Sequence, residues 1–326
     1  MKSVATTDAE AGSPSEEPVE TLPGESASPA EQKPPAETGK KPGKKKSRAG
    51  RNLPAAIAVG VTIGAVLIAT LLWFPRFWVA LCAGAILLAS HEVVRRLREA
   101  GYLIPVIPLL VGGQVTVWLT WPYGAEGAAA GFGGVVVVCM IWRLFMQDNR
   151  EADNVEGAPP PSNYLRDVSA TVFLCAWVPL FGSFAAMLVY DPQHGPARVF
   201  CMMIAVVCSD TGGYAIGALF GKHPMVPKIS PKKSWEGFAG SLVFGITATI
   251  LTATFLAGQP PWVGALLGLL FVLTTTLGDL IESQVKRDLG IKDMGRLLPG
   301  HGGLMDRLDG ILPSSVAAWA VLTLLP

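Results

Sequence analysis

Acidic and basic side chains recur at helical spacing near the end of the sequence. Asp279, Glu282 and Lys286 are three and then four residues apart, so they share one face of a helix. Asp306 and Asp309 are also three residues apart. Hard divalent cations take oxygen ligands, and Mg²⁺ is typically held by one or two carboxylates together with substrate phosphates. These two acidic pairs therefore predict a site for Mg²⁺, with one ion or two, that also binds a polyphosphate.

A basic segment earlier in the chain, Lys228 to Ser234, carries three lysines and two hydroxyl groups within seven residues. Lysine side chains, hydroxyls and free backbone N–H groups are suited to an anionic phosphate ligand. An ordinary cytosolic loop of a membrane protein would also hold lysines, but it would not need the prolines Pro227 and Pro231. We therefore expect this segment to bind phosphate.

Asp210 stands alone within an apolar run of the sequence. An unpaired carboxylate costs about 2.5–3.5 kcal/mol inside a membrane helix on insertion scales. Such a residue is expected to have a partner. The partner is either a metal or charged group in the site, or a hydrogen bond between buried helices.

The rest of the chain is strongly apolar. Of its 326 residues, 50% are hydrophobic and only 16% are charged, whereas a soluble domain has roughly 25% charged residues. A helix needs about 20 consecutive apolar residues to cross a bilayer. About nine segments come close to that length or exceed it, and they predict an all-α, polytopic integral membrane protein: residues 53–74, 77–94, 102–121, 127–146, 168–190, 198–220, 237–257, 262–282 and 304–325.

Positive charge predicts the orientation of these spans, because the cytosolic connections of membrane proteins are enriched in Lys and Arg. With the N-terminus in the cytosol, the outer connections hold only Arg76 and Arg198 of the 26 basic residues. We therefore expect the N-terminus and the charged segments at the cytosolic face of the membrane. The membrane itself is expected to be the cell's inner (plasma) membrane.

Residues 1–52 differ in composition from the rest of the chain. They are rich in Pro, Ala, Glu, Ser and Lys and have few large apolar side chains, so they cannot bury enough surface to offset their ordering entropy. We predict a disordered cytosolic tail over residues 1–52 and one transmembrane domain over residues 53–326. The basic end of the tail, Lys40 to Arg51, is expected either to contact anionic lipids or to act only in orienting the chain.

The five cysteines all lie in apolar runs and lack the spacing of zinc ligands. We expect them to be small buried hydrophobic residues, without a disulfide framework.

The charged segments together resemble a known family. The stretch from Ser283 to Asp309 consists of SQVKR, four further residues, KDMG, two further residues and LPGHGGLMDRLD. It resembles the signature of the phosphatidate cytidylyltransferases (CDP-diacylglycerol synthases) at every fixed position. The stretches Ser209 to Tyr214 and Gly221 to Gly237 resemble the same family, and the resemblance covers residues 53–326.

This resemblance implies transfer of the cytidylyl group of CTP to phosphatidate, giving CDP-diacylglycerol and pyrophosphate, by a Mg²⁺-dependent homodimer embedded among membrane lipids. The positions that match the family's metal ligands are Asp279, Asp306 and Asp309. The positions expected to take part in the reaction are Asp279, Asp306, Lys286 and Asp210. The positions expected to bind the nucleotide or the lipid phosphate are Lys228, Ser230, Lys232, Lys233, Ser283, Arg287, His301 and Arg307.

Other functions stay open on the sequence alone. Asp210 and the interrupted spans could line the ion path of a transporter, although the charged segments lie at one face and no inverted repeat is evident. A CDP-alcohol phosphotransferase would carry a differently spaced acidic motif, and a relative acting on an isoprenoid phosphate would share the same chemistry. Nucleic acid is not an expected partner, because the basic residues lie at the membrane face without interleaved aromatic residues.

Overall fold

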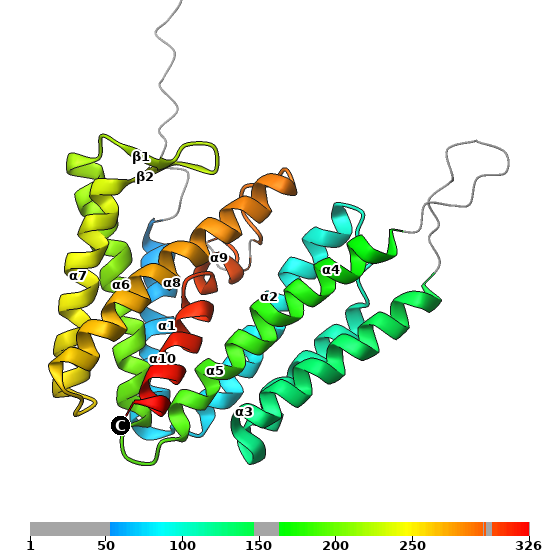
Figure 1. Cartoon of the computed structure of the whole chain (residues 1–326), viewed down its shortest axis with the longest axis horizontal. Coiled ribbons are helices and arrows are strands. Elements are labelled where there is room, and N and C mark those ends of the chain that lie inside the picture. The colour runs from blue at the N-terminus through cyan, green and yellow to red at the C-terminus, as the bar shows by residue number, and fades with distance from the viewer. Residues whose placement is uncertain (1–52, 147–162, 296, 298–301, 326) are drawn as a thin grey trace, which may run out of the picture. The chain divides into compact units, whose positions relative to one another are not determined.

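A computed structural model describes residues 53–146, 163–295, 297 and 302–325, which belong to one compact unit (Figure 1). The predicted tail of residues 1–52 lies outside the described residues. The division of the chain into a tail and one transmembrane domain therefore stays a prediction.

The described chain is mostly helical, as the sequence predicts. Its helices are α1 (Leu53–Trp73), α2 (Phe77–Glu99), α3 (Val106–Phe145), α4 (Tyr164–Cys175), the π-helical turn η1 (Ala176–Leu180), α5 (Phe181–Met187), the 3₁₀ turn η2 (Leu188–Tyr190), α6 (Gly195–Phe220), α7 (Trp235–Phe255), α8 (Pro261–Asp288), α9 (Met305–Leu308) and α10 (Ile311–Leu324).

Each of the predicted apolar segments overlaps a helix, and the described residues include six helical runs long and apolar enough to cross a membrane. These runs are α2, α3, the continuous stretch Tyr164–Tyr190, α6, α7 and α8. They identify the chain as a multi-pass membrane protein. The number of nine spans stays a prediction, because α3 joins two of the predicted segments across a kink at Gly124 (φ 55°) and α10 has only 14 residues.

Proline and serine residues explain where several helices begin or change pitch. Pro196 and Pro261 stand in the first turns of α6 and α8, where the missing N–H would have no partner within the helix. Ser234 caps α7, because its Oγ accepts the Gly237 N–H at 3.1 Å. Pro179 lies inside the run from α4 to α5, and the helix widens there into the π-helical turn η1.

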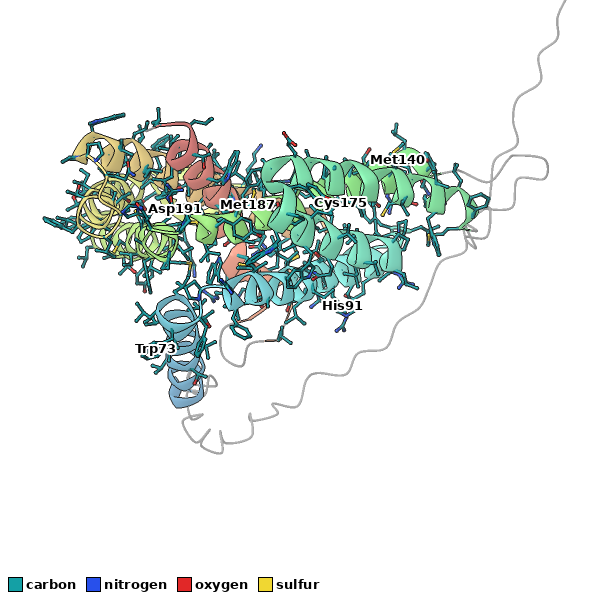
Figure 2. The ribbon with its side chains drawn as sticks, turned by 90° about the horizontal axis from the view of Figure 1, so that it is seen from below. Trp73, His91, Met140, Cys175, Met187 and Asp191 are labelled. Atoms are coloured by element: carbon teal, nitrogen blue, oxygen red, sulfur yellow. The ribbon has the colours of Figure 1, made fainter. Side chains whose placement is uncertain are left out.

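Helices α6, α7 and α8 lie side by side, and α10 packs against α8 and α5 (Figure 1). Gly245 of α7 lies where three helices meet, since a Cβ there would come 2.6 Å from Val272 of α8 and 3.3 Å from Ser209 of α6. Cys175 and Met187 lie buried among the packed helices (Figure 2). The five cysteines are free, and four of them are buried as predicted, whereas Cys208 is partly exposed.

A buried ion pair joins α3 to α4. The Arg143 guanidinium donates from Nη2 and Nε to Asp167 Oδ2 at 2.8 and 3.0 Å. Both side chains are at most 6% exposed. The pair therefore satisfies two charges that would otherwise be costly between membrane helices.

The prediction of an all-α fold is wrong at one place. Between α6 and α7 the chain forms a hairpin of two antiparallel strands, β1 (Pro224–Val226) and β2 (Ser230–Ser234). Glu236 of α7 fixes this hairpin, because it accepts the backbone N–H groups of Lys222 and His223 at 3.1 and 3.2 Å and pairs with the His223 ring at 2.5 Å. The basic segment is thus held in the turn and second strand of a hairpin instead of a loose loop.

Candidate active site

A cavity of about 610 Å³ lies where α6, α7 and α8 meet the hairpin and the segment around α9. Predicted site residues gather here from four separate parts of the chain. Those that line the cavity are Asp210, Ser230, Lys232, Lys233, Asp279, Lys286, Asp306, Arg307 and Asp309.

Three carboxylates form a cluster on one side of this cavity. One ligand oxygen from each of Asp279, Glu282 and Asp309 lies within 4.8 Å of the other two. Asp279 and Glu282 meet because they are one helical turn apart on α8, as the spacing predicts. Asp309 reaches them because the residue before Asp279 on α8 is a glycine. A Cβ at Gly278 would lie 2.1 Å from the Asp309 carbonyl oxygen. The absence of a side chain at this position brings the cluster together.

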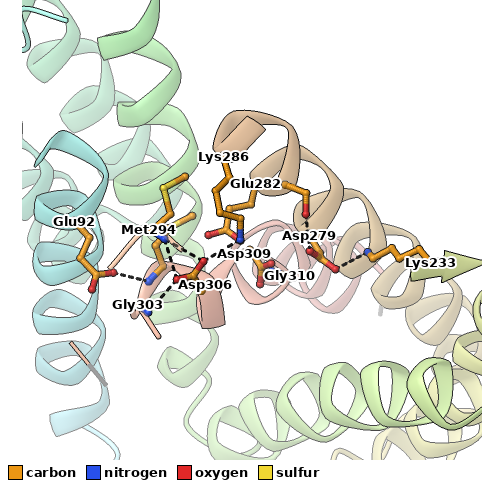
Figure 3. A network of polar contacts seen from close by, with 12 residues as sticks. Glu92, Lys233, Asp279, Glu282, Lys286, Met294, Gly303, Asp306, Asp309 and Gly310 are labelled. Carbon is orange, nitrogen blue, oxygen red and sulfur yellow. Dashed lines mark hydrogen bonds and ion pairs between the residues drawn. The ribbon is translucent and has the colours of Figure 1, made fainter. Parts of the chain in front are cut away.

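Lys286 bridges the two acidic segments from the next turn of α8 (Figure 3). Its Nζ lies 2.6 Å from Glu282 Oε2 and 2.9 Å from Asp306 Oδ1. Two carboxylates around one ammonium group stabilise its charged form and hold its position in a half-buried site.

Asp306 is placed differently from the three clustered carboxylates. Besides Lys286, it accepts the backbone N–H of Met294 at 3.1 Å and that of Gly303 at 3.0 Å. Its carboxylate therefore joins two points of the segment between α8 and α9, Met294 and Gly303, and Lys286 links it to α8. The predicted role of Asp306 as a metal ligand stays a prediction.

The hairpin faces the acidic cluster across the cavity. Lys233 on β2 lies with its Nζ 2.6 Å from Asp279 Oδ2 and 3.4 Å from the Thr276 carbonyl oxygen. Lys232 and Ser230 of the same strand also line the cavity. The basic segment and the acidic cluster, predicted separately, thus belong to one site.

Three of the predicted residues that the structure describes do not line the cavity. Lys228 is exposed at the hairpin turn, and Arg287 donates to the Ile229 carbonyl oxygen at 3.4 Å, which joins α8 to that turn. Ser283 donates to Asp279 Oδ1 at 3.3 Å and so contacts the site indirectly. His301 lies outside the described residues.

Two acidic residues of the site region were absent from the site residues that the resemblance implied. Glu282 belongs to one of the two acidic pairs predicted to bind Mg²⁺ but was not among the metal ligands implied by the resemblance, although it is buried and its Oε1 has no hydrogen-bond partner among the described residues. Glu92 of α2 is buried against the segment that carries Asp306. The presence of a carboxylate within the apolar sequence of α2 could have indicated that Glu92 has a partner.

Comparison with known proteins adds to this geometry. A model described as the cytidylyltransferase family matches residues 54–325. The chain belongs to the cytidylyltransferase family. It is therefore a membrane-embedded nucleotidyltransferase, and the resemblance predicted from its charged segments is confirmed.

Individual members of the family are similar to this chain over most of its length. A phosphatidate cytidylyltransferase of Mycobacterium tuberculosis is 72% identical over 325 residues, covering 100% of this chain and 94% of the relative. One from Mycobacterium leprae is 76% identical over 282 residues, covering 86% and 90%. A more distant one, from Brucella melitensis, is 29% identical over 249 residues, covering 67% and 91%.

Proposed function

We propose that the cavity binds CTP and the headgroup of phosphatidate, and that the enzyme transfers the cytidylyl group between them. A phosphate oxygen of phosphatidate attacks the α-phosphorus of CTP. The bond from that phosphorus to the oxygen bridging the β-phosphate breaks, so that CDP-diacylglycerol forms and pyrophosphate leaves. A cluster of three carboxylates that faces the lysines of a hairpin across one cavity carries this proposal.

The acidic cluster fits a divalent cation such as Mg²⁺. Asp279, Glu282 and Asp309 offer hard oxygen ligands, and the buried Oε1 of Glu282 lacks a hydrogen-bond partner among the described residues. Bound Mg²⁺ would neutralise phosphate charge and polarise the phosphorus under attack. We propose that these three residues hold the first ion, and that Asp306 becomes available to a second when Lys286 turns toward phosphate.

The basic residues neutralise the remaining charge of two anions that must approach each other. Lys232 and Lys233 line the cavity from the hairpin, and Lys286 lines it from α8. Lys233 and Lys286 are paired with carboxylates in the structure. Arrival of the nucleotide would let these ammonium groups exchange carboxylate oxygens for phosphate oxygens. Lys233 and Lys286 are thus positioned before the substrate binds.

The attacking oxygen of phosphatidate is already anionic, so the reaction needs no strong general base. The contribution of the chain is to hold the two phosphates in line and to stabilise developing charge on the leaving pyrophosphate. Asp210 of α6 and Arg307 of α9 line the same cavity, and we assign them to positioning the lysines and phosphates. Ser230 would donate a hydrogen bond to phosphate from β2.

We further propose nine spans, a cytosolic N-terminus and a cavity open to the cytosolic face of the inner (plasma) membrane. The hairpin and the C-terminal end of α8 lie at the same end of the helices in Figure 1. Basic residues of the sequence concentrate in these segments, which supports their cytosolic placement. A homodimer surrounded by membrane lipids completes the proposal.

An assay of the purified full chain in detergent tests the reaction. CTP and Mg²⁺ are supplied with phosphatidate, with an isoprenoid phosphate, or with no lipid, and both pyrophosphate and CDP-lipid are measured. We expect equimolar pyrophosphate and CDP-diacylglycerol with phosphatidate only. Release of pyrophosphate that does not depend on phosphatidate, or faster turnover of the isoprenoid phosphate, would overturn the proposal.

A further inference from the structure

One buried carboxylate near the site belongs to a helix that does not line the cavity. Glu92 lies in α2, and none of the described residues of α2 lines the cavity. The side chain is only 9% exposed. A charge buried to this extent in an apolar helix is costly unless its contacts compensate for lost hydration.

The contacts of Glu92 are with the segment between α8 and α9 (Figure 3). Its Oε2 accepts the backbone N–H of Met305 at 3.0 Å, across 213 residues of sequence. Met305 is the first residue of α9 and directly precedes Asp306. The bond therefore fixes the backbone directly before Asp306.

Glycines let this segment close around the carboxylate. A Cβ at Gly295 would lie 2.0 Å from Glu92 Oε1, and one at Gly303 would lie 2.9 Å from Glu92 Oε2. The same Cβ at Gly303 would also lie 2.8 Å from Asp306 Oδ2. Both carboxylates thus lie close to the backbone of Gly303.

A second residue of α2 contacts the same segment. Arg96, one turn after Glu92, donates from Nε to the Met294 carbonyl oxygen at 2.7 Å. The N–H of Met294 in turn donates to Asp306. Arg96 thus binds Met294 and Glu92 binds Met305. The N–H groups of Met294 and Gly303 both donate to Asp306, which in turn pairs with Lys286.

We infer that Glu92 is a positioning residue for the transfer reaction. It holds the start of α9 through the Met305 N–H, and so keeps Asp306 within reach of Lys286. The active site is thereby fastened to α2 as well as to the helices that line it. This inference rests on the proposed function for its kinetic readout, but the hydrogen-bond network that it invokes can be measured without substrate.

The test compares Glu92→Ala with Glu92→Gln in the purified full chain. Glutamine keeps a carbonyl oxygen that can accept the Met305 N–H, whereas alanine leaves that N–H without its acceptor. We expect Glu92→Ala to lower kcat by about tenfold or more, the size of effect expected for one buried unpaired group, with less change in the KM for CTP. The KM should change less because the hairpin that carries Lys232 and Lys233 is fixed by Glu236 of α7, not by α2. We expect the kcat of Glu92→Gln to stay within about threefold of that of the native sequence, because the hydrogen-bond acceptor is retained.

Amide hydrogen exchange gives a readout that does not require turnover. In Glu92→Ala the amides of residues 294 and 302–306 should exchange faster, while those of α7 should not change. This readout still tests the contact if the proposed reaction is wrong. Arg96→Met, which removes the Met294 contact, should show the same pattern if Glu92→Ala fails to fold.

Asp167→Asn is the matched control, since Asp167 is a buried carboxylate of the α3–α4 ion pair that does not line the cavity. It should lower the unfolding temperature and leave kcat per folded molecule unchanged. Three results would each overturn the inference: full kcat in Glu92→Ala, equal losses in Glu92→Ala and Glu92→Gln, or unchanged exchange at residues 302–306.

Discussion

Lys233 and Asp279 form an ion pair, with 2.6 Å between Nζ and Oδ2, across the cavity between the hairpin and α8. The two residues were predicted to bind different partners, since the lysine suits phosphate and the aspartate suits a metal ion. Both side chains are partly exposed, at 25% and 41%. Partly exposed ion pairs contribute little to stability. A phosphate can therefore replace Asp279 beside Lys233, and a divalent cation can replace Lys233 beside Asp279, at a small cost in free energy.

Lys233→Ala should therefore weaken nucleotide binding. The variant loses a charged donor that faces the phosphate site, and a hydrogen bond to a charged group is worth about 1.5–3 kcal/mol. We expect the KM for CTP to rise by roughly tenfold or more, with a smaller change in the KM for phosphatidate. Steady-state kinetics with each substrate varied in turn measures this.

Arg95→Ala is the control for that experiment. Arg95 also pairs with an acidic residue, Glu99, at 2.9 Å, but its side chain is 68% exposed and lies on α2 away from the cavity. The KM for CTP should not change in this variant. An equal rise in both variants would show that the loss of positive charge at the membrane face, and not the cavity contact, is responsible.

Asp279→Asn should strongly reduce turnover while the protein still inserts and folds. The amide keeps the shape of the side chain but supplies a poorer ligand for a hard cation, and metal neutralisation is worth several kcal/mol in such reactions. We expect kcat to fall by about a hundredfold or more at saturating Mg²⁺. A magnesium titration of activity is the measurement.

Asp288→Asn on the same helix is the comparison for Asp279→Asn. Asp288 is exposed and accepts a hydrogen bond from Gln284 at 2.7 Å, outside the described lining of the cavity. Its substitution should leave the magnesium dependence unchanged. Near-normal activity of Asp279→Asn would contradict the assignment of this carboxylate to the metal.

Gly278→Ala tests whether the close approach of α8 to Asp309 assembles the acidic cluster. The new methyl group would lie 2.1 Å from the Asp309 carbonyl oxygen and 3.0 Å from Pro313, so α8 and the start of α10 must separate. We expect kcat to fall by about tenfold, since misplacement by an ångström is costly in catalysis. Gly134→Ala in α3 meets nothing within 4 Å and should keep full activity. Equal activities would indicate that the cluster tolerates the displacement.

Local spacing explains what the sequence could predict about this site. Asp279, Glu282 and Lys286 share a face because helical geometry alone places residues three and four apart together. The apolar segments predict helices for a similar reason, since backbone groups within a bilayer must be satisfied inside each helix. Both inferences depend only on neighbours in the chain.

Contacts between distant segments explain what the sequence could not predict. Glu92 and Met305 meet only after α2 and α9 have packed, and nothing in the spacing of either segment specifies the partner. The hairpin was missed because its strands, of three and five residues, contain proline and lysine, which are depleted in strands. Its stability comes from Glu236, which binds the chain from the following helix.

The buried pair of Arg143 and Asp167 gives a prediction about stability instead of catalysis. Arg143→Met leaves the Asp167 carboxylate buried without its charged partner, which costs about 3–5 kcal/mol in buried ion pairs of this kind. We expect a clearly lower unfolding temperature in detergent, with kcat per folded molecule unchanged because both residues lie away from the cavity.

The double variant Arg143→Met with Asp167→Leu removes both charges and should recover much of the lost stability. Replacing a whole buried pair with apolar side chains is often neutral, whereas removal of one partner is not. Thermal unfolding of the two single variants and the double variant completes the cycle and gives the coupling between the residues. A double variant as unstable as the sum of the singles would mean that each residue stabilises the α3–α4 contact through other partners, such as the Met146 carbonyl oxygen that Arg143 also contacts at 3.2 Å.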